Sequence, residues 1–320
     1  MLRFLCVMAL LLSLSGCSDD DKPAAQVLDD VTRGAFLRTL EIRNNVFAID
    51  DLNSTFSIEI QEQDIENGGL MKGVNVLVQF IDNTIDEIDL TTQAILLETI
   101  PADAFSLGDF ELPVTDIEYS FAELLEATDL DQSEVSCKDQ FIILLDLVLN
   151  DERVFGNNNA AACILAYDSF FRSPFLYTIT VVEPIEDVLF TGTYTYESIV
   201  DGFNGPTFGP PILVQVEYGG RKNVRTVKFD NFPGRLPRPY YFTIACDELI
   251  FEKYQIRYNT TNLSCGPTGQ PILLGPDSEN APINPIDDSV FEIWFVEGYE
   301  GFDGGLNIGT VPSRLRFTKE

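Results

Sequence analysis

Apolar and polar residues alternate along most of this chain with a period of two, the pattern of half-buried β-strands. Residues 56–60 and 74–80 are clear examples, with apolar side chains on one face and polar ones on the other. Residues 141–149 are almost continuously apolar, which predicts a central strand buried on both faces. Residues 175–182, rich in Tyr, Ile, Thr and Val, predict a further strand.

One segment breaks this alternation and predicts a helix. Ser120 precedes residues 121–127, and Glu123 follows Ser120 by three positions, which is the spacing of a capping box. About seven short strands with one helical connection predict an immunoglobulin-like β-sandwich over residues 28–184.

A second β-rich region follows the Glu183-Pro184 step. Proline residues there fall between the alternating segments, where a missing N–H does not interrupt a ladder. The fold class is therefore all-β, with a C-terminal β-barrel or sandwich-like domain over residues 185–320. An up-and-down meander is one topology that fits these segments. Its strands are expected at residues 190–196, 212–218, 224–230, 240–246, 249–252, 290–296 and 313–318.

The net charge of −31 excludes classes of partner. Nucleic acid is not expected, since like charges repel and no basic stripe is present. The charge is also uneven: residues 1–184 have 33 acidic and 9 basic residues, and residues 185–320 have 18 and 11. This change in composition supports a domain boundary near residue 184. Solubility at a crowded cell surface explains the acid excess, and divalent cation binding is the alternative.

The N-terminus has the layout of a secretory signal. Arg3 is followed by an apolar run that is too short to span a bilayer as a helix. The run ends in Leu14-Ser15-Gly16-Cys17, which resembles a bacterial lipobox. The resemblance implies that residues 1–16 are a signal peptide cleaved before Cys17, and that Cys17 is lipidated. Residues 17–27 would then be an acidic tether.

Ser18-Asp19-Asp20-Asp21-Lys22 directly follows Cys17. This run resembles the acidic export signal of Bacteroidota surface lipoproteins, which implies lipid anchoring in the outer membrane, facing the cell exterior. Together with two β modules, it is similar to the accessory lipoproteins of SusC/SusD-type importers. The alternative for this run is a solvated linker.

Four cysteines remain in the mature chain: Cys137, Cys163, Cys246 and Cys265. Export permits disulfides, and four cysteines allow three pairings. With a boundary near residue 184, the local pairs Cys137–Cys163 and Cys246–Cys265 are expected. A zinc site is disfavoured because the chain has no Cys-x-x-Cys pair and no His.

The sequence contains few of the residue combinations that indicate an active site. The lack of His excludes Ser-His-Asp and Cys-His sites. Carboxylates are abundant, but no particular pair is marked as that of a glycosidase. We therefore expect no enzymatic activity and no resident cofactor.

Calcium is the one metal that the composition leaves open. Asp82, Asp86 and Asp89 place hard oxygen ligands close together in an expected loop, without the central Gly and closing Glu of an EF-hand. The alternative is a solvated loop.

Aromatic residues of the second region are candidate ligand contacts. Trp294 is the only Trp and shares a strand face with Glu292, opposite the expected core face. Tyr240 and Tyr241 follow two prolines at the start of a strand. Sugars stack on such aromatic faces, although a core or interface role is the more ordinary explanation for them.

These features predict a non-enzymatic surface lipoprotein that captures a glycan or peptide near an outer-membrane importer. The alternatives are a structural or adhesive protein that binds another protein and, less favoured, a carboxylate-based hydrolase. Aromatic residues lining a groove favour a ligand, whereas a broad apolar patch favours a protein partner.

Overall fold

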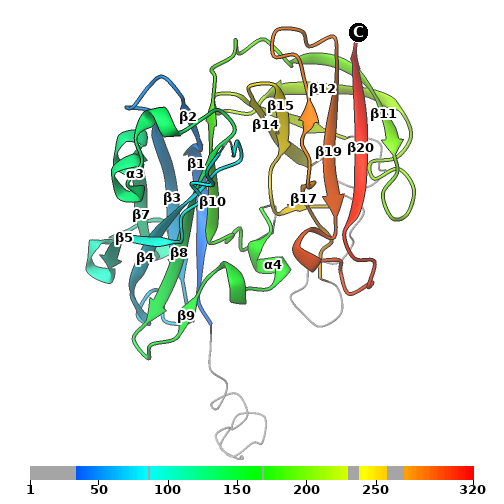
Figure 1. The fold of residues 1–320 in the computed structure, drawn as a ribbon. Helices are drawn as coiled ribbons and strands as arrows, with labels where there is room; N and C mark the ends of the chain where they lie inside the picture. The colour runs from blue at the N-terminus through cyan, green and yellow to red at the C-terminus, as the bar shows by residue number, and fades with distance from the viewer. Residues whose placement is uncertain (1–33, 86, 168, 230–237, 258–269) are drawn as a thin grey trace, which may run out of the picture. The chain divides into compact units, whose positions relative to one another are not determined.

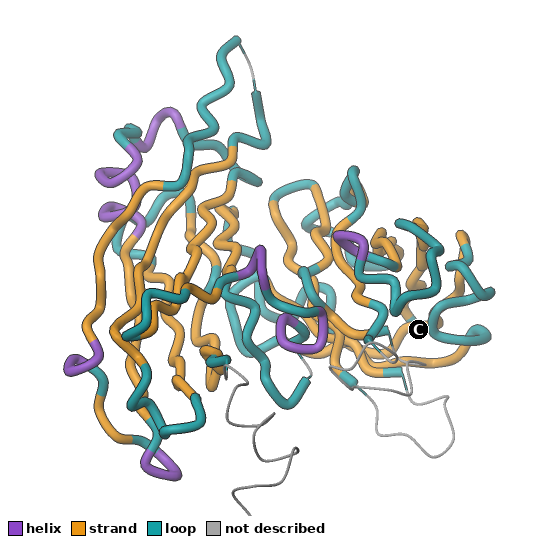
Figure 2. The backbone as a smooth tube through the Cα atoms, turned by 90° about the horizontal axis from the view of Figure 1, so that it is seen from below, coloured by secondary structure: helices purple, strands orange, loops and turns teal. Residues whose placement is uncertain are grey.

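The computed structural model describes residues 34–85, 87–167, 169–229, 238–257 and 270–320. The predicted signal peptide, Cys17 and the tether lie outside these residues, as do Asp86 and Cys265. The strands of the described residues form three sheets, and Ala35–Glu320 form one compact unit. Figure 2 shows how strongly strands dominate over helices. The predicted all-β class is confirmed.

The first two sheets form a sandwich. One has the strand order β1-β3-β7-β6, and the other has the order β2-β10-β8-β4-β5, with β9 paired to β8. The strands are β1 (Phe36–Asn44), β2 (Val46–Ala48), β3 (Thr55–Gln63), β4 (Met71–Ile81), β5 (Ile95–Pro101), β6 (Ser106–Leu107), β7 (Pro113–Ser120), β8 (Gln140–Leu149), β9 (Val154–Phe155) and β10 (Leu176–Val182).

This topology is that of an immunoglobulin-like fold. Taken in their order across each sheet, β1, β3, β7 and β6 occupy the places of strands A, B, E and D, and β10, β8 and β4 occupy those of G, F and C. Strand β5 adds a C′ strand at the edge. As predicted, the apolar run of β8 lies in the middle of its sheet, between β10 and β4.

Aromatic packing fills the place of the usual immunoglobulin disulfide and Trp. Neither β3 nor β8 contains Cys, and β4 contains no Trp. Instead, Phe141 on β8 packs against Phe80 on β4 and Phe47 on β2, with ring centroids 5.1 and 5.9 Å apart. Offset and edge contacts of this kind stabilise a core beyond the area they bury.

The predicted helix is α3 (Phe121–Thr128), and Ser120 caps it in a capping box with Glu123. Its apolar side chains pack into the sandwich core, and the helix lies against β4, β5 and β7 (Figure 1). The other helical segments are short: α4 (Ala162–Leu165), η3 (Ala102–Ala104), η4 (Asp109–Glu111), η5 (Gln132–Glu134), η6 (Asn157–Asn159) and η7 (Tyr299–Gly301).

The third sheet is antiparallel throughout its described pairs and contains an up-and-down meander from β11 to β15. It curls, because β15 contacts β17 and β19, which lie near the opposite end of the strand order. Its strands are β11 (Gly192–Val200), β12 (Ile212–Tyr218), β13 (Val224–Lys228), β14 (Pro239–Ala245), β15 (Glu248–Phe251), β16 (Gln255–Ile256), β17 (Leu273–Pro276), β18 (Ala281–Pro282), β19 (Val290–Glu297) and β20 (Val311–Lys319).

The predicted boundary near residue 184 lies in the connection between the second and third sheets. Packing nevertheless crosses this connection, since Tyr254, Ile256 and Leu273 of the C-terminal region belong to the same hydrophobic cluster as the sandwich core. The curled sheet also has a core of its own, built largely from Phe and Tyr side chains.

Candidate functional site

A cleft of about 870 Å³ opens between the sandwich and the curled sheet. On the sandwich side its wall is the outer face of β10 and neighbouring residues: Asn45, Asn83, Lys138, Gln140, Tyr167, Leu176, Thr178 and Thr180. On the other side it is lined by β14, β15, β19 and the loops beside them, with Thr243, Asp247, Glu248, Glu252, Lys253, Tyr254, Asp277, Glu279, Asn280, Trp294 and Tyr299 among the residues.

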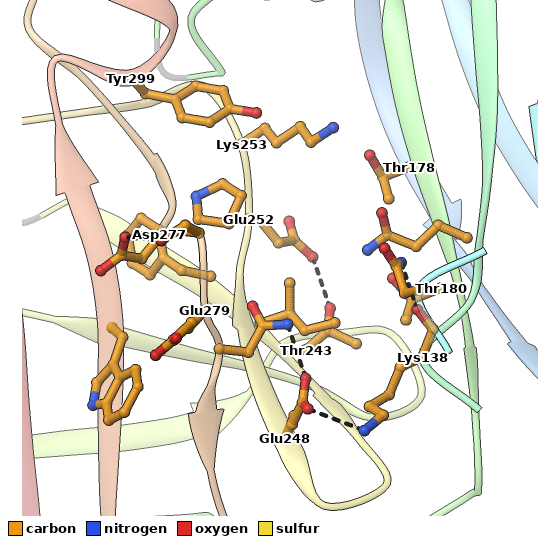
Figure 3. A pocket seen from close by; sticks show the side chains of 18 of the residues that line it. Lys138, Thr178, Thr180, Thr243, Glu248, Glu252, Lys253, Asp277, Glu279 and Tyr299 are labelled. Carbon is orange, nitrogen blue, oxygen red and sulfur yellow. Dashed lines mark hydrogen bonds and ion pairs between the residues drawn. The ribbon is translucent and has the colours of Figure 1, made fainter. Parts of the chain in front are cut away.

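A disulfide and ion pairs join the two walls. Cys137 is bonded to Cys246. The next residue along the chain, Lys138, places its Nζ 3.0 Å from Glu248 Oε1 (Figure 3). The same Nζ lies 3.2 Å from Asp247 Oδ1. The hydrogen bond to Glu248 and the attraction of both carboxylates raise the pKa of Lys138 against the effect of burial.

This bond corrects the expected cysteine pairing. Cys137 is bonded to Cys246 rather than to Cys163, so the bridge links the two halves of the chain instead of closing a loop within one. Cys163 is also disulfide-bonded, and Cys265 lies outside the described residues. The expectation of local pairs was wrong because it assumed that the halves do not share an interface.

A second polar connection crosses the interface behind the cleft. Arg221 pairs with Glu252 on one side (3.2 Å) and donates to Asn45 Oδ1 on the other (2.8 Å). Asn45 in turn donates through Nδ2 to the carbonyl oxygen of Thr178, 3.2 Å away. Arg221 and Glu252 are both buried or nearly so, so this pair is less screened by salt than surface pairs are.

Lys253 lies between β15 and β16 and differs from the other charged residues of the cleft. Within the described part of the chain, no carboxylate lies within 4.0 Å of its Nζ, and Nζ makes no hydrogen bond. Figure 3 shows its ammonium end directed toward Thr178 on the opposite wall. Burial lowers the pKa of Lys253, and Glu300 acts in the opposite direction.

Tyrosines surround this end of the cleft. The Tyr254 hydroxyl donates to Glu300 Oε2 (2.7 Å) and accepts from Asn157 Nδ2 (2.8 Å). Its ring lies edge-on to that of Tyr299, with centroids 5.7 Å apart. Burial raises the pKa of both tyrosines, and the neighbouring Glu300 raises it further. Both phenols are therefore neutral hydrogen-bonding groups at physiological pH.

Trp294 lines the cleft, and its surroundings follow from the register of β19 and β20. Phe291, Ile293 and Phe295 point into the core as predicted, which places Trp294 and Glu292 together on the other face. Trp294 Nε1 donates to Glu292 Oε2 (2.8 Å). The Arg314 guanidinium covers one face of the indole, 3.8 Å from its centroid, so the ring is held in a fixed orientation.

Glu292 itself has a structural partner. Arg316, its cross-strand neighbour on β20, lies 3.1 Å from Glu292 Oε1, while Oε2 receives the indole N–H. Glu292 therefore orients Trp294 and does not line the cleft, so its expected role as a direct ligand contact is corrected to a positioning one.

The two tyrosines predicted as contacts lie elsewhere. Tyr240 is fully buried, and its hydroxyl donates to the carbonyl oxygen of Ile256 (3.0 Å), so it is a core residue and the prediction of contact was wrong. Tyr241 points to the opposite face of β14, half-buried, with the Arg221 guanidinium 5.3 Å from its ring centroid. It does not belong to the cleft lining.

The acidic loop predicted as a calcium site uses its carboxylates to hold its own backbone. Asp82 accepts from the backbone N–H groups of Thr84 and Leu90, each at 3.0 Å. Asp89 accepts from that of Thr91 at 2.9 Å. Among the described residues, which do not include Asp86, no group of three or more acidic or Cys side chains is arranged to hold a metal ion.

Sequence reasoning did not select Lys253, Thr178 or Lys138. One signal was present: Thr178 and Thr180 place hydroxyls on the same face of an otherwise apolar strand. The positions of the two lysines depend on how the halves of the chain meet, which no local pattern encodes.

Comparison of the chain with protein-family models and with curated proteins finds no match. Within the described residues, no helix is long and apolar enough to cross a bilayer.

Proposed function

We propose that this protein is a non-catalytic binding protein that captures a glycan in the cleft between its sandwich and its curled sheet. The observation that carries the proposal is the combination, in one cleft, of an oriented Trp294 with hydroxyl, amide and carboxylate groups from several strands. An apolar ring face with convergent hydrogen-bonding groups is the usual composition of a small-ligand site.

The proposed cellular location rests on the N-terminal sequence. The resemblance of Leu14-Ser15-Gly16-Cys17 to a lipobox, and of the acidic run after it to a surface-export signal, supports a lipid-anchored protein at the outer membrane, facing outward. At that place a glycan-binding cleft suits an accessory of a nutrient importer. A peptide ligand would use the same hydrogen-bonding groups and is the second candidate.

The arrangement of the cleft carboxylates favours binding over hydrolysis. A glycosidase needs two carboxyl groups that face each other across the scissile bond. Here Glu248 is paired with Lys138 and Glu252 with Arg221, so each of these two acids faces a cation. We therefore propose that they shape and orient the site.

Replacing Trp294 tests this function. In a glycan-array and affinity-gel screen of residues 23–320, with and without calcium, we expect a glycan to bind and its affinity to fall about 5- to 150-fold in Trp294→Ala. This range takes the contribution of a base stacked on an aromatic ring, on the order of 1–3 kcal/mol, as the scale for a stacked sugar. Phe110→Ala is the matched control, because Phe110 is 87% exposed on η4, away from the cleft.

Two results would contradict this proposal. Equal binding by the wild type and Trp294→Ala would place the glycan elsewhere. Absence of binding to every glycan, with and without calcium, would favour a protein partner, to be sought by pull-down from the outer-membrane fraction.

A further inference from the structure

Two hydrogen-bond donors at one end of the cleft have no partner among the described residues. The first is the Lys253 ammonium, which makes no ion pair and no hydrogen bond there. The second is the Thr178 hydroxyl, whose Oγ1 is buried and makes no hydrogen bond. They come from opposite walls, and Figure 3 shows Lys253 directed toward Thr178 across the space between them.

The charged side chains near Lys253 already form ion pairs or hydrogen bonds with other groups. Glu252, the residue before Lys253, is paired with Arg221, and Glu300 accepts a hydrogen bond from Tyr254. The other lysine of the cleft, Lys138, is held by Asp247 and Glu248. Lys253 is thus the cation of the cleft lining whose charge is not matched by a close carboxylate of the described residues.

An ammonium group can only donate hydrogen bonds, so whatever satisfies Lys253 must be an acceptor. A partly buried charge without a partner is costly, and a charged acceptor offsets this cost better than a neutral one does. The Thr178 hydroxyl on the facing wall is a further buried donor without a hydrogen-bond partner among the described residues. These requirements describe an anionic oxygen acceptor, and the carboxylate of an acidic sugar is such a group.

We propose that the Lys253–Thr178 end of the cleft is a carboxylate subsite, and that the glycan captured is acidic, with a uronic-acid unit bound there. The inference rests on the proposed glycan-binding function and deepens it by naming the class of glycan. Trp294 then stacks on a sugar ring while Lys253 selects the charged unit.

The acidity of the protein repels an acidic glycan, so the contact with Lys253 has to outweigh that repulsion. Asp277 and Glu279 lie on the wall opposite Thr178 in Figure 3. Their repulsion and that of the net charge of −31 weaken as salt is added, since the Debye length is about 8 Å at physiological ionic strength. The partly buried contact with Lys253 is screened less. Binding should therefore persist when the salt concentration rises, unlike nonspecific attraction of a polyanion to lysines.

The experiment compares acidic glycans with versions that lack the charge. Polygalacturonate, alginate and hyaluronan, each beside its carboxyl-reduced form, are titrated against the purified full-length protein in detergent at 50 and 300 mM salt. We expect at least one acid form to bind about tenfold more tightly than its reduced form, as for a charge-assisted hydrogen bond, with little loss at high salt.

Lys253→Met preserves the length of the side chain and removes its charge. It is expected to abolish the difference between the acid and reduced forms while leaving binding of the reduced form unchanged. Thr178→Val is expected to lower affinity for the acid form less strongly. Lys222→Met is the matched control, because Lys222 is an exposed lysine outside the cleft lining, and circular dichroism establishes that each variant is folded.

Three outcomes would overturn the inference. If acid and reduced forms bind the wild type equally, or if Lys253→Met keeps the preference for the acid form, the carboxylate subsite is wrong, while the glycan-binding function stands. If no glycan of either kind binds, both the function and the subsite fail.

Discussion

At the scale of single residues, Glu62 combines a buried carboxyl group with a raised pKa. It lies fully buried on β3, and neither carboxyl oxygen makes a hydrogen bond. The carboxylate of Asp64, two residues further on, accepts hydrogen bonds from the backbone N–H groups of Glu66, Gly68 and Leu70. Burial, then the charge of Asp64, raises the pKa of Glu62 to about 8. The folded protein therefore keeps this carboxyl protonated at neutral pH.

The pKa of Glu62 predicts a decline of stability with pH. Between about pH 4.5 and 8 the folded state retains a proton that the unfolded state has lost, so the free energy of unfolding falls as pH rises, by at most about 1.4 kcal/mol per pH unit, and levels off above 8. Glu62→Gln should lack this decline. Urea unfolding of both proteins at pH 5.5, 7.0 and 8.5 measures how the free energy of unfolding changes with pH. Glu66→Gln, at an exposed position of the loop that follows β3, should keep the wild-type slope. Parallel pH profiles for the wild type and Glu62→Gln would show that Glu62 is already ionised.

At the scale of elements, α3 shows how local chemistry positions a piece of the core. Ser120 ends β7 and accepts a hydrogen bond from Glu123 N–H (3.3 Å), while Glu123 Oε2 accepts from Ser120 N–H (2.7 Å). This reciprocal capping turns the chain from strand to helix at one residue. Phe121, the first residue of the helix, then packs on Phe47 and Phe141.

Removal of the N-terminal cap of α3 should lower the stability of the protein by a small but measurable amount. Ser120→Ala should lower the free energy of unfolding by about 1 kcal/mol, because the N–H group of Glu123 loses its acceptor at the helix start. Glu126→Ala, on the exposed side of the same helix, should change it by less than about 0.5 kcal/mol. Equal effects of the two substitutions in chemical denaturation would mean that the cap makes no specific contribution.

At the scale of the whole molecule, the Cys137–Cys246 bridge joins the loop before β8 to the turn between β14 and β15. Lys138, Asp247 and Glu248 reinforce the same junction and belong to the cleft lining. Disulfide, ion pairs and cleft thus occupy one interface, and the geometry of the site depends on how the sandwich and the curled sheet are held together.

Loss of this bridge should destabilise the fold as a whole. The two cysteines are 109 residues apart, and the chain-entropy model gives a loop of this size up to about 4.7 kcal/mol of stabilisation. Cys137→Ser combined with Cys246→Ser should therefore lower the midpoint of denaturant unfolding, and addition of a reductant should affect the double variant less than the wild type. An unchanged midpoint in the double variant would show that noncovalent contacts alone hold the interface.

Alternation along the chain determined the strands and the faces that they bury, because side chains point to opposite sides of a strand with a period of two. The core face of β19 and the position of Trp294 opposite to it followed from this rule alone. The capping box of α3 did as well, since its partners are three residues apart.

Three features were decided only in the tertiary structure: the bonding of Cys137 to Cys246, the burial of Tyr240 and the placement of Lys253 and Thr178 in one cleft. Each depends on residues that are distant in sequence and on how two curved sheets pack against each other. A pattern with a period of two records which way a side chain points, but not what lies opposite to it.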